Sequence, residues 1–180
     1  MKTVTKSYKY RIYPNKEQQD ILEFNMGSAR FVFNHVKAMY ELYRKQAVEY
    51  GLKPVYANKK LFNSILNDLK KHHPFLKEAN STALQKAYDD LISAYKMVGK
   101  GNGGVKFKSR KNPVQSFRTL NAEIVDGKLK LPKINTLISM KYSRKVRGDI
   151  LSATISRNNS NQYFVSFNVK NSPVKQLKKN

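Results

Sequence analysis

The chain opens with alternating hydrophobic and polar residues and then changes to a helical spacing. In "SYKYRIYP", Tyr8, Tyr10 and Ile12 fall on one side of an extended chain, and Lys9 and Arg11 fall on the other. This period of two is typical of a half-buried strand. The pattern therefore predicts a short strand that ends at the proline, with its apolar side in the core.

A helical pattern follows at once and continues to about residue 50. Asn15 can cap the helix, and Gln18 three residues later completes a capping box. Gly27 and Ser28 lie in the middle of the pattern, so two helices and one bent helix fit equally well. The predicted apolar stripe comprises Ile21, Leu22, Met26, Ala29, Phe33, Val36, Tyr40, Tyr43 and Ala47.

Two further helical patterns precede residue 99. The first lies within "VYANKKLFNSILNDLKKHH" and closes at Pro74, and the second begins near "NSTALQKAYDDLISAYKM" with Asn80, Ser81 or Thr82 as its cap. The first 98 residues thus predict one strand followed by three or four helices.

The remainder of the chain predicts β-structure. A glycine-rich basic connection over 100–115 leads to short alternating runs, with turn signals at "DG" (126–127) and "RNNSNQ" (157–162). We expect four to six strands here, joined by the opening strand, and a frayed tail over 171–180. The glycine-rich connection lacks P-loop spacing and predicts no nucleotide site. The predicted class is α+β: a sheet or barrel interrupted by an inserted helical segment.

Charge narrows the function. The chain has 35 Lys and Arg against 12 Asp and Glu, a formal net charge of +23. Residues 91–180 hold 19 basic and 3 acidic side chains, so the second half carries most of this charge. Such a surface predicts binding to nucleic-acid phosphates, with affinity that falls as salt rises. General basicity without a specific ligand is the plainer alternative.

Other features limit the classes of protein. No apolar run is long enough for a membrane span and no secretory signal is recognisable. Cysteine is absent, which excludes disulfides and thiolate zinc sites and predicts a reducing cytoplasm. The acidic residues are scattered, and no histidine or carboxylate spacing suggests metal ligands. We therefore expect no catalytic residues, no metal and no cofactor in this chain.

One stretch has the geometry to read nucleic acid. In "NSTALQ", Ser81, Thr82 and Gln85 would share one rim of a helix near its N-terminus, where phosphates and base edges are within reach. An ordinary cap with an exposed glutamine explains the same residues more simply. The aromatic residues of the first helical pattern are expected in the core rather than as platforms for bases: Phe31, Phe33, Tyr40 and Tyr43.

Several segments together resemble one family. "YKYRIYPNKEQQDIL", "GSARFVFNHV", "NSTALQKAYDDLISAYK", "KFKSRKN" with "SFRT", "DGKLKLPKI" and "SATISRNNSNQYFVSFNV" occur in the order found in TnpB, or OrfB transposases, relatives of the type V CRISPR effectors. The resemblance covers nearly all of residues 6–170 and concerns the N-terminal half of these transposon-encoded RNA-guided nucleases.

The resemblance implies a fold. It implies a wedge-type β-barrel interrupted by a recognition segment of three or four helices. The implied boundaries are a first barrel strand over 1–13, the helical segment over 14–99, a basic linker over 100–115, the rest of the barrel over 116–170 and a tail over 171–180. The RuvC-like nuclease domain of the family, with its "GIDLG"-like strand, is not recognisable in this sequence, so we expect no nuclease activity from it.

The resemblance also implies binding residues. A transposon-adjacent motif in double-stranded DNA would be read by Ser81, Thr82, Gln85, Thr119 and Asn121. The backbones of a transposon-end guide RNA and of the RNA-DNA heteroduplex would be contacted by Lys9, Arg11, Arg30, Lys106, Lys108, Arg110, Lys111 and Arg118.

The function expected from this sequence is nucleic-acid binding without cleavage, in a bacterial or archaeal cytoplasm at the nucleoid. A separate nuclease subunit is a further partner to consider. Two alternatives stay open: a stand-alone helix-turn-helix-type repressor that uses no RNA, and an RNA-binding accessory protein unrelated to transposons.

Overall fold

The protein has an α+β fold, as the sequence predicts. The structure is a computed structural model that describes residues 3–99, 101 and 103–173. Three α-helices precede most of the strands, and five strands form one antiparallel sheet. The elements are β1 (Thr3–Tyr13), α1 (Lys16–Glu49), α2 (Lys59–His72), the 3-10 helix η1 (Pro74–Lys77), α3 (Ser81–Val98), β2 (Gln115–Thr119), β3 (Glu123–Val125), β4 (Lys128–Lys130), β5 (Ser139–Met140), β6 (Asp149–Arg157) and β7 (Tyr163–Pro173).

The chain divides into two compact units. Residues 1–22 and 113–180 make up the first, which we call the sheet unit, and residues 23–112 make up the second, the helical unit. One division falls within α1 and the other follows the basic segment that precedes β2. Each unit is described separately below.

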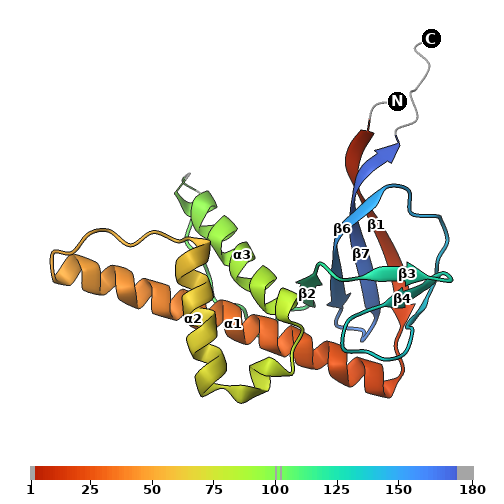
Figure 1. Ribbon diagram of the computed structural model, residues 1–180, viewed down its shortest axis with the longest axis horizontal. Coiled ribbons are helices and arrows are strands. Elements are labelled where there is room, and N and C mark those ends of the chain that lie inside the picture. Colours follow the sequence, from red (N-terminus) through yellow and green to blue (C-terminus); the bar gives the residue numbers. More distant parts are fainter. Residues whose placement is uncertain (1–2, 100, 102, 174–180) are drawn as a thin grey trace, which may run out of the picture. The chain divides into compact units, whose positions relative to one another are not determined.

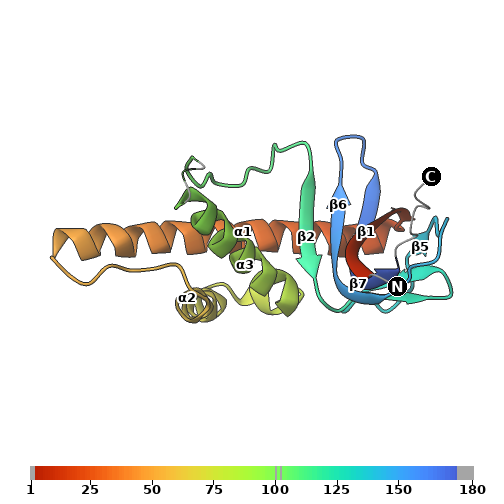
Figure 2. The ribbon, with the colours of Figure 1, turned by 90° about the horizontal axis from the view of Figure 1, so that it is seen from above.

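The strands of the sheet unit run in the order β2-β6-β7-β1-β5. β1 and β7, which come from opposite ends of the chain, lie side by side (red and blue in Figure 1), with Tyr10 opposite Val165. The prediction that the opening strand joins the C-terminal strands is confirmed. Figure 2 shows β2 beside β6 at one edge of the sheet, and β5 is the other edge strand. No pairing closes β2 onto β5 within the described residues, so a closed barrel is not formed by them.

The apolar side of β1 is buried, as its alternation predicts. Tyr10 and Ile12 are 2% and 1% exposed, and their cross-strand neighbours on β7 are also buried. Because side chains alternate along a strand, this places Lys9 and Arg11 on the opposite face of the sheet.

Both predicted turns are present. Asp126 and Gly127 join β3 to β4 with positive φ angles of 49° and 72°, which a two-residue hairpin of this kind requires. β6 and β7 are joined over 158–162, where the Asn158 side chain accepts hydrogen bonds from the backbone N–H groups of Ser160 and Gln162. The prediction of a tail from residue 171 is wrong at its start, because β7 continues to Pro173 in pairing with β1. The rest of the predicted tail lies outside the described residues.

The first helix is one continuous element, which decides between the two predicted alternatives. Gly27 and Ser28 are helical within α1, and Ser28 is buried. Glycine in a helix interior costs about 1 kcal/mol relative to alanine. The buried neighbours Met26, Ala29 and Val32 offset that cost, because an uninterrupted helix keeps them in the core.

The helix starts follow the sequence closely. At the start of α1, Asn15 N–H donates to Gln18 Oε1 and Gln18 N–H donates to Asn15 Oδ1, both at 2.9 Å, which is the predicted capping box. Asn58 caps α2 and Asn80 caps α3. The three predicted candidates for the α3 cap are thereby reduced to Asn80.

The helical unit is held together by aromatic packing around α1. The Tyr40 ring of α1 contacts Phe62 of α2 at 5.4 Å and Tyr95 of α3 at 4.7 Å between ring centroids. Phe62 is completely buried, and its ring also packs edge-to-face on Tyr88. The expectation that Tyr40 and Phe33 belong to the core is confirmed.

Candidate nucleic-acid interface

Strand register places the two cations of β1 around one aromatic ring. On the face of the sheet opposite Tyr10, Arg11 lies directly across from Phe164 of β7. The Lys9 Nζ atom is 4.6 Å from the centroid of the Phe164 ring, and the Arg11 Cζ atom is 5.3 Å from it. Cation–π attraction therefore holds both positive charges above the sheet.

Arg11 is held further by its own strand. Its Cζ atom lies 5.5 Å from the centroid of the Tyr13 ring, and its Nε atom is buried without a hydrogen-bond partner. Because this Nε atom is buried, a ligand cannot reach it, and the two ring contacts are what position the Arg11 guanidinium group. Arg11 is thus well placed to take an anionic ligand.

Small hydroxyl side chains surround these cations. Thr154 and Ser166 lie in the same cross-strand row as Lys9, and the row ends at Arg118 on β2. The Ser7 and Ser166 hydroxyls are 2.8 Å apart. We call this side of the sheet the cationic face: Ser7, Lys9, Arg11, Ser116, Arg118, Thr154, Ser156, Phe164 and Ser166. Short polar side chains between cations leave room for a sugar-phosphate backbone to lie close to the strands.

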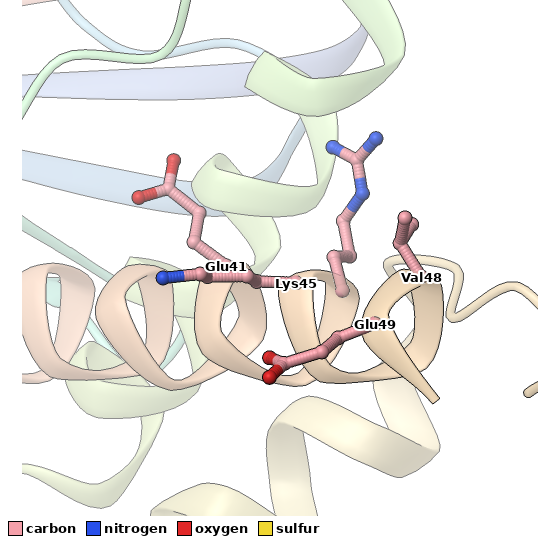
Figure 3. Close-up of a pocket in the computed structure, with 5 residues that line it drawn as sticks. Glu41, Lys45, Val48 and Glu49 are labelled. Atoms are coloured by element: carbon pink, nitrogen blue, oxygen red, sulfur yellow. The ribbon is translucent and has the colours of Figure 1, made fainter. Parts of the chain in front are cut away.

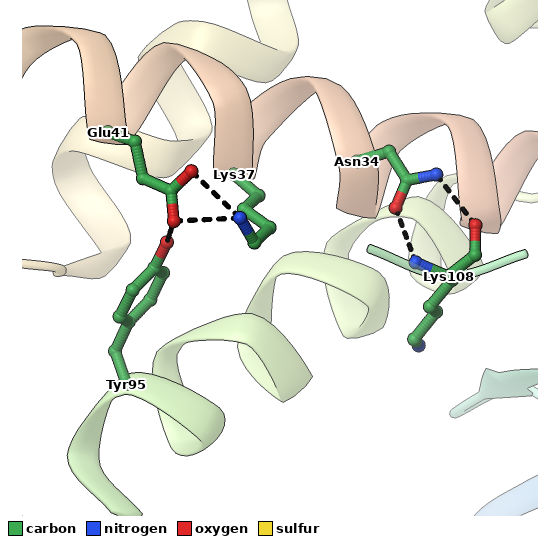
Figure 4. A network of polar contacts seen from close by, with 5 residues as sticks. All are labelled: Asn34, Lys37, Glu41, Tyr95 and Lys108. Carbon is green, nitrogen blue, oxygen red and sulfur yellow. Dashed lines mark hydrogen bonds and ion pairs between the residues drawn. The ribbon is translucent and has the colours of Figure 1, made fainter. Parts of the chain in front are cut away.

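In the helical unit, a basic segment is fixed without helix or strand. Residues 105–111, which we call the basic strap, have no regular secondary structure. The Asn34 side chain of α1 pairs with both backbone groups of Lys108: its Nδ2 donates to the Lys108 carbonyl at 2.9 Å, and its Oδ1 accepts from the Lys108 N–H at 2.8 Å (Figure 4). The Asn34 amide thus satisfies the backbone hydrogen-bonding groups of Lys108, as a neighbouring strand would in a sheet.

Two cation–π contacts add to this clamp. Lys108 Nζ lies 4.1 Å from the Phe33 ring centroid, and Phe107 covers the Lys37 ammonium group at 3.8 Å. The strap side chains Lys106, Arg110 and Lys111 are exposed. Because the backbone is held, these cations lose less conformational freedom when they bind phosphate.

A polar network lies next to the strap on α1. Lys37, whose side chain is only 5% exposed, donates to both carboxylate oxygens of Glu41 at 2.7 and 2.8 Å, and the Tyr95 hydroxyl donates to the same carboxylate at 3.0 Å (Figure 4). Burial raises the pKa of the Tyr95 hydroxyl, and its hydrogen bond to Glu41 raises that pKa further. The network therefore holds the Lys37 and Tyr95 side chains in place on the same carboxylate.

Three of the five residues predicted to read DNA, Ser81, Thr82 and Gln85, lie at the start of α3. Asn80 Oδ1 accepts hydrogen bonds from the Thr82 N–H at 3.0 Å and the Thr82 hydroxyl at 2.9 Å, so Thr82 is engaged in the cap. Ser81 and Gln85 are exposed one turn apart. The Asn80 N–H donates to Asn25 Oδ1 at 2.8 Å, which fixes the start of α3 against α1.

The other two predicted DNA-reading residues lie in the sheet unit. Thr119 is completely buried at the end of β2, on the apolar side of the sheet. Its hydroxyl accepts a hydrogen bond of 3.4 Å from the Asn121 N–H, and Asn121 is exposed. In this structure Thr119 supports the turn, whereas Asn121 is accessible to a ligand.

The predicted backbone-binding residues divide between the units. Lys9, Arg11 and Arg118 gather on the cationic face, and Lys106, Lys108, Arg110 and Lys111 belong to the basic strap. Arg30 also lies in the helical unit, but it is half-buried on α1 and is not part of the basic strap. Sequence reasoning missed Phe164 and Asn34. Alternation along "QYFVSFNVK" put Phe164 on the polar side of its strand, which was a usable signal, whereas nothing in the sequence pointed to Asn34.

A surface hollow on α1 of about 610 Å³ is lined by Glu41, Arg44, Lys45, Val48 and Glu49, side chains from successive turns of one exposed helix face (Figure 3).

Within residues 3–99, 101 and 103–173, no three His, Asp or Glu side chains gather as metal ligands would. None of the helices described is both long and apolar enough to cross a membrane.

Comparison with known proteins agrees with the resemblance found in the sequence. Residues 1–48 match a family described as a helix-turn-helix domain, that of OrfB proteins of the IS605 type. A protein of Streptomyces pristinaespiralis named "Putative RNA-guided DNA endonuclease" is 26% identical over 178 residues. That alignment covers 92% of this chain and 42% of the relative, so the chain spans less than half the length of the curated relative it matches.

The matched segment has a specific local structure. Its described part, residues 3–48, consists of β1 and nearly all of α1, and the next helix begins only at Lys59. A second helix therefore comes after the match and not within it. Residues 1–48 therefore match the helix-turn-helix domain of OrfB proteins of the IS605 type, and the chain as a whole is similar to part of a protein named as a putative RNA-guided DNA endonuclease.

Proposed function

We propose that this chain is the nucleic-acid-binding part of a TnpB-like protein, which binds a transposon-end guide RNA and a short transposon-adjacent motif in double-stranded DNA. The observation that carries the proposal is the cationic face. There, Lys9 and Arg11 are held over Phe164 beside hydroxyl side chains, on a chain of formal charge +23. Cations with a ring and hydroxyls between them suit contacts to phosphate, sugar and unstacked bases.

The two units have different roles in this proposal. The cationic face and the basic strap contact RNA and heteroduplex backbones by charge and shape. At the start of α3, Ser81 and Gln85 contact the DNA motif, and Thr82 supports the helix cap that positions them. In the sheet unit, Asn121 contacts DNA and Thr119 supports the turn that carries it. In this proposal the sheet unit takes the place of the wedge-type barrel and the helical unit that of the recognition segment. The two compact units divide at residues 22–23 and 112–113, whereas the boundaries expected from the family lie at 13–14, 99–100 and 115–116. The 180 residues bind nucleic acid without cutting it.

RNA binding is tested with the triple variant Lys9→Ala, Arg11→Ala, Arg118→Ala. The transposon-end RNA and a scrambled RNA of equal length are titrated with the purified chain at 0.1 and 0.3 M salt. We expect tighter binding of the transposon-end RNA, a loss of about 100-fold in the triple variant and a shallower salt dependence, because about three phosphate contacts disappear. The control Lys45→Ala, Lys53→Ala, Lys60→Ala removes the same charge from exposed positions in the helical unit. Equal losses in both variants would show that general basicity, and not the cationic face, binds RNA.

DNA reading and the absence of cleavage need separate measurements. Replacing Ser81 and Gln85 by alanine should reduce the preference for the cognate motif by about 1–3 kcal/mol for each base contact that is lost, while non-specific affinity is kept.

Incubation of the chain with its RNA, target DNA and Mg²⁺ should leave the DNA intact, and cleavage by the pure chain would refute that part of the proposal. A chain that purifies free of RNA and still protects an operator would instead be a repressor.

A further inference from the structure

Five aromatic and imidazole rings gather on the surface of the helical unit. Phe24, Phe31 and His35 come from one side of α1, and His73 and Phe75 come from the corner between α2 and η1. We call these five residues the ring patch. Phe31 stacks on His35 with 3.8 Å between centroids and meets Phe75 edge-to-face at 5.3 Å. Phe24 also packs edge-to-face on Phe75, at 6.3 Å.

The ring patch is separate from the hydrophobic core. Phe24 and Phe75 are 37% and 41% exposed, whereas Phe33 and Phe62 on the core sides of their helices are 4% and 0% exposed. The expectation that Phe31 is a core residue is wrong, because its side chain is only half-buried and faces this cluster. Clustered exposed rings mark an interaction site more often than scattered ones do.

The rings are held in a fixed arrangement. His35 Nδ1 lies 2.9 Å from the Phe31 carbonyl oxygen, and this contact keeps its imidazole stacked on the Phe31 ring. His73 contacts Phe31 at 4.9 Å and His35 at 5.9 Å between centroids. The imidazoles add polar ring edges to an otherwise apolar surface, which suits a planar ligand that is both aromatic and polar.

The surroundings favour an anionic ligand. Lys70 and Lys71 lie in the last turn of α2 and Lys77 lies in η1, so three lysines flank the two ring residues of this corner in sequence. Lys71 Nζ pairs with Asp68 Oδ1 at 3.0 Å, and both of these side chains are exposed. The patch also neighbours the start of α3: Phe24 precedes Asn25, whose side chain accepts the 2.8 Å hydrogen bond from the Asn80 N–H. A base with its phosphate meets both requirements, because the base stacks on rings while lysines neutralise the phosphate.

We propose that the ring patch binds an unpaired nucleobase by stacking, next to the helix start that reads the DNA motif. The proposal rests on the proposed function and adds a site for single-stranded nucleic acid to it. The base comes from either RNA or DNA, since both present the same π-face.

The test uses the full chain and three oligonucleotides that carry 2-aminopurine: a single-stranded RNA, a single-stranded DNA and a blunt duplex DNA. Stacking should quench the fluorescence of the single strands. Phe75→Ala should abolish the quenching and weaken single-strand binding about tenfold, with unchanged duplex affinity and unchanged salt slope, because no charge is lost. Phe75→Tyr should restore quenching, and Tyr50→Ala, which removes a more exposed ring elsewhere, should have no effect. The single strand that is quenched more strongly identifies the source of the base.

The outcomes separate this site from the proposed function. Phe24→Ala provides a second test if Phe75→Ala lowers the melting temperature, because Phe24 is a similarly exposed member of the patch. Unchanged quenching in both folded variants would overturn the ring-patch proposal while leaving RNA binding by the cationic face intact. Self-association of the wild-type chain in sedimentation that Phe75→Ala abolishes, without quenching of either strand, would also overturn it and identify a protein-docking surface. Loss of binding in the triple variant of the cationic face bears only on the proposed function.

Discussion

The sheet unit and the helical unit fix their cations in different ways. In the sheet unit, Lys9 and Arg11 are positioned by the register of β1 against β7, a ladder of backbone pairs that extends from Thr3 to Ile12. In the helical unit, the basic strap has no ladder and depends on the Asn34 clamp and on two cation–π contacts.

The difference indicates how each surface can fail. A register is shared by many hydrogen bonds and changes only when the whole strand pair changes, so the cationic face should be lost together with the fold of the sheet. A clamp made by one amide is local, so the strap can detach while its helices stay folded. The following predictions test this contrast, from the largest expected effect to the smallest.

The largest effect is expected from a backbone change in the sheet. Gly148, just before β6, has a φ of 111°, and a Cβ atom there would collide with the main-chain oxygen of Lys170 and lie 2.9 Å from Val169 Cγ1. Gly148→Ala should therefore lower the free energy of unfolding by about 3 kcal/mol, as measured by urea denaturation. Gly104→Ala is the control, because nothing lies within 4 Å of its Cβ position. A loss below about 1 kcal/mol would show that the β6–β7 ladder tolerates local change.

The second effect concerns the buried ammonium group of the helical unit. Glu41→Gln keeps the size of the side chain but removes the charge that faces Lys37, whose own side chain is 5% exposed. We expect a loss of about 2 kcal/mol in unfolding free energy, less than for a fully buried pair because the Glu41 side chain is 44% exposed. Glu49→Gln, on the exposed end of the same helix, should change stability by less than 0.5 kcal/mol. Equal effects of the two variants would refute a specific role for the Lys37–Glu41 pair.

A smaller and more local effect is expected at the strap clamp. Asn34→Ala removes both hydrogen bonds to the Lys108 backbone and should cost about 1 kcal/mol. Trypsin should then cut faster after Lys106, Lys108 and Arg110, while cleavage elsewhere keeps its wild-type rate. Asn63→Ala, at an exposed site on α2, serves as the control. Unchanged cleavage of the strap in Asn34→Ala would show that the clamp does not hold it.

The smallest effect depends on pH. The pKa of Tyr95 is raised in the folded protein, so the stability that its neutral hydroxyl contributes is complete below about pH 10 and decreases as the pH rises toward the folded pKa. Tyr95→Phe should cost about 0.5–1 kcal/mol at pH 7, because the hydrogen bond to Glu41 is lost, and should reduce the fall in stability between pH 9 and 11. Denaturation curves at both pH values measure this. An identical alkaline decline in the variant would assign it to other groups.

Much of the fold follows from local patterns. The period of two in "SYKYRIYP" predicts the buried side of β1, and Asn15 with Gln18 predicts the start of α1. These predictions succeed because alternation and capping depend on residues that are close in sequence. Local pattern could not decide between two helices and one bent helix at Gly27 and Ser28. The structure has one continuous helix, because burial of this helix by distant segments outweighs the low helix propensity of glycine.

The candidate sites needed contacts between distant segments. Phe164 meets Arg11 only because β7 pairs with β1 in one register, and Asn34 meets Lys108 across 74 positions of sequence. Phe31 had the helical spacing of a core residue, yet the corner that carries Phe75 places it in the ring patch.

The sequence alone determined the class of fold, the strand and helix order, and the excess of positive charge that predicts a nucleic-acid ligand. Periodicity, capping and net charge are properties of neighbouring residues or of the whole composition, so they need no tertiary structure. Only the tertiary structure decided which cations are held in place, and by what. Register, side-chain clamps and ring clusters arise when residues far apart in the chain are brought together, and local patterns carry no information about such pairs.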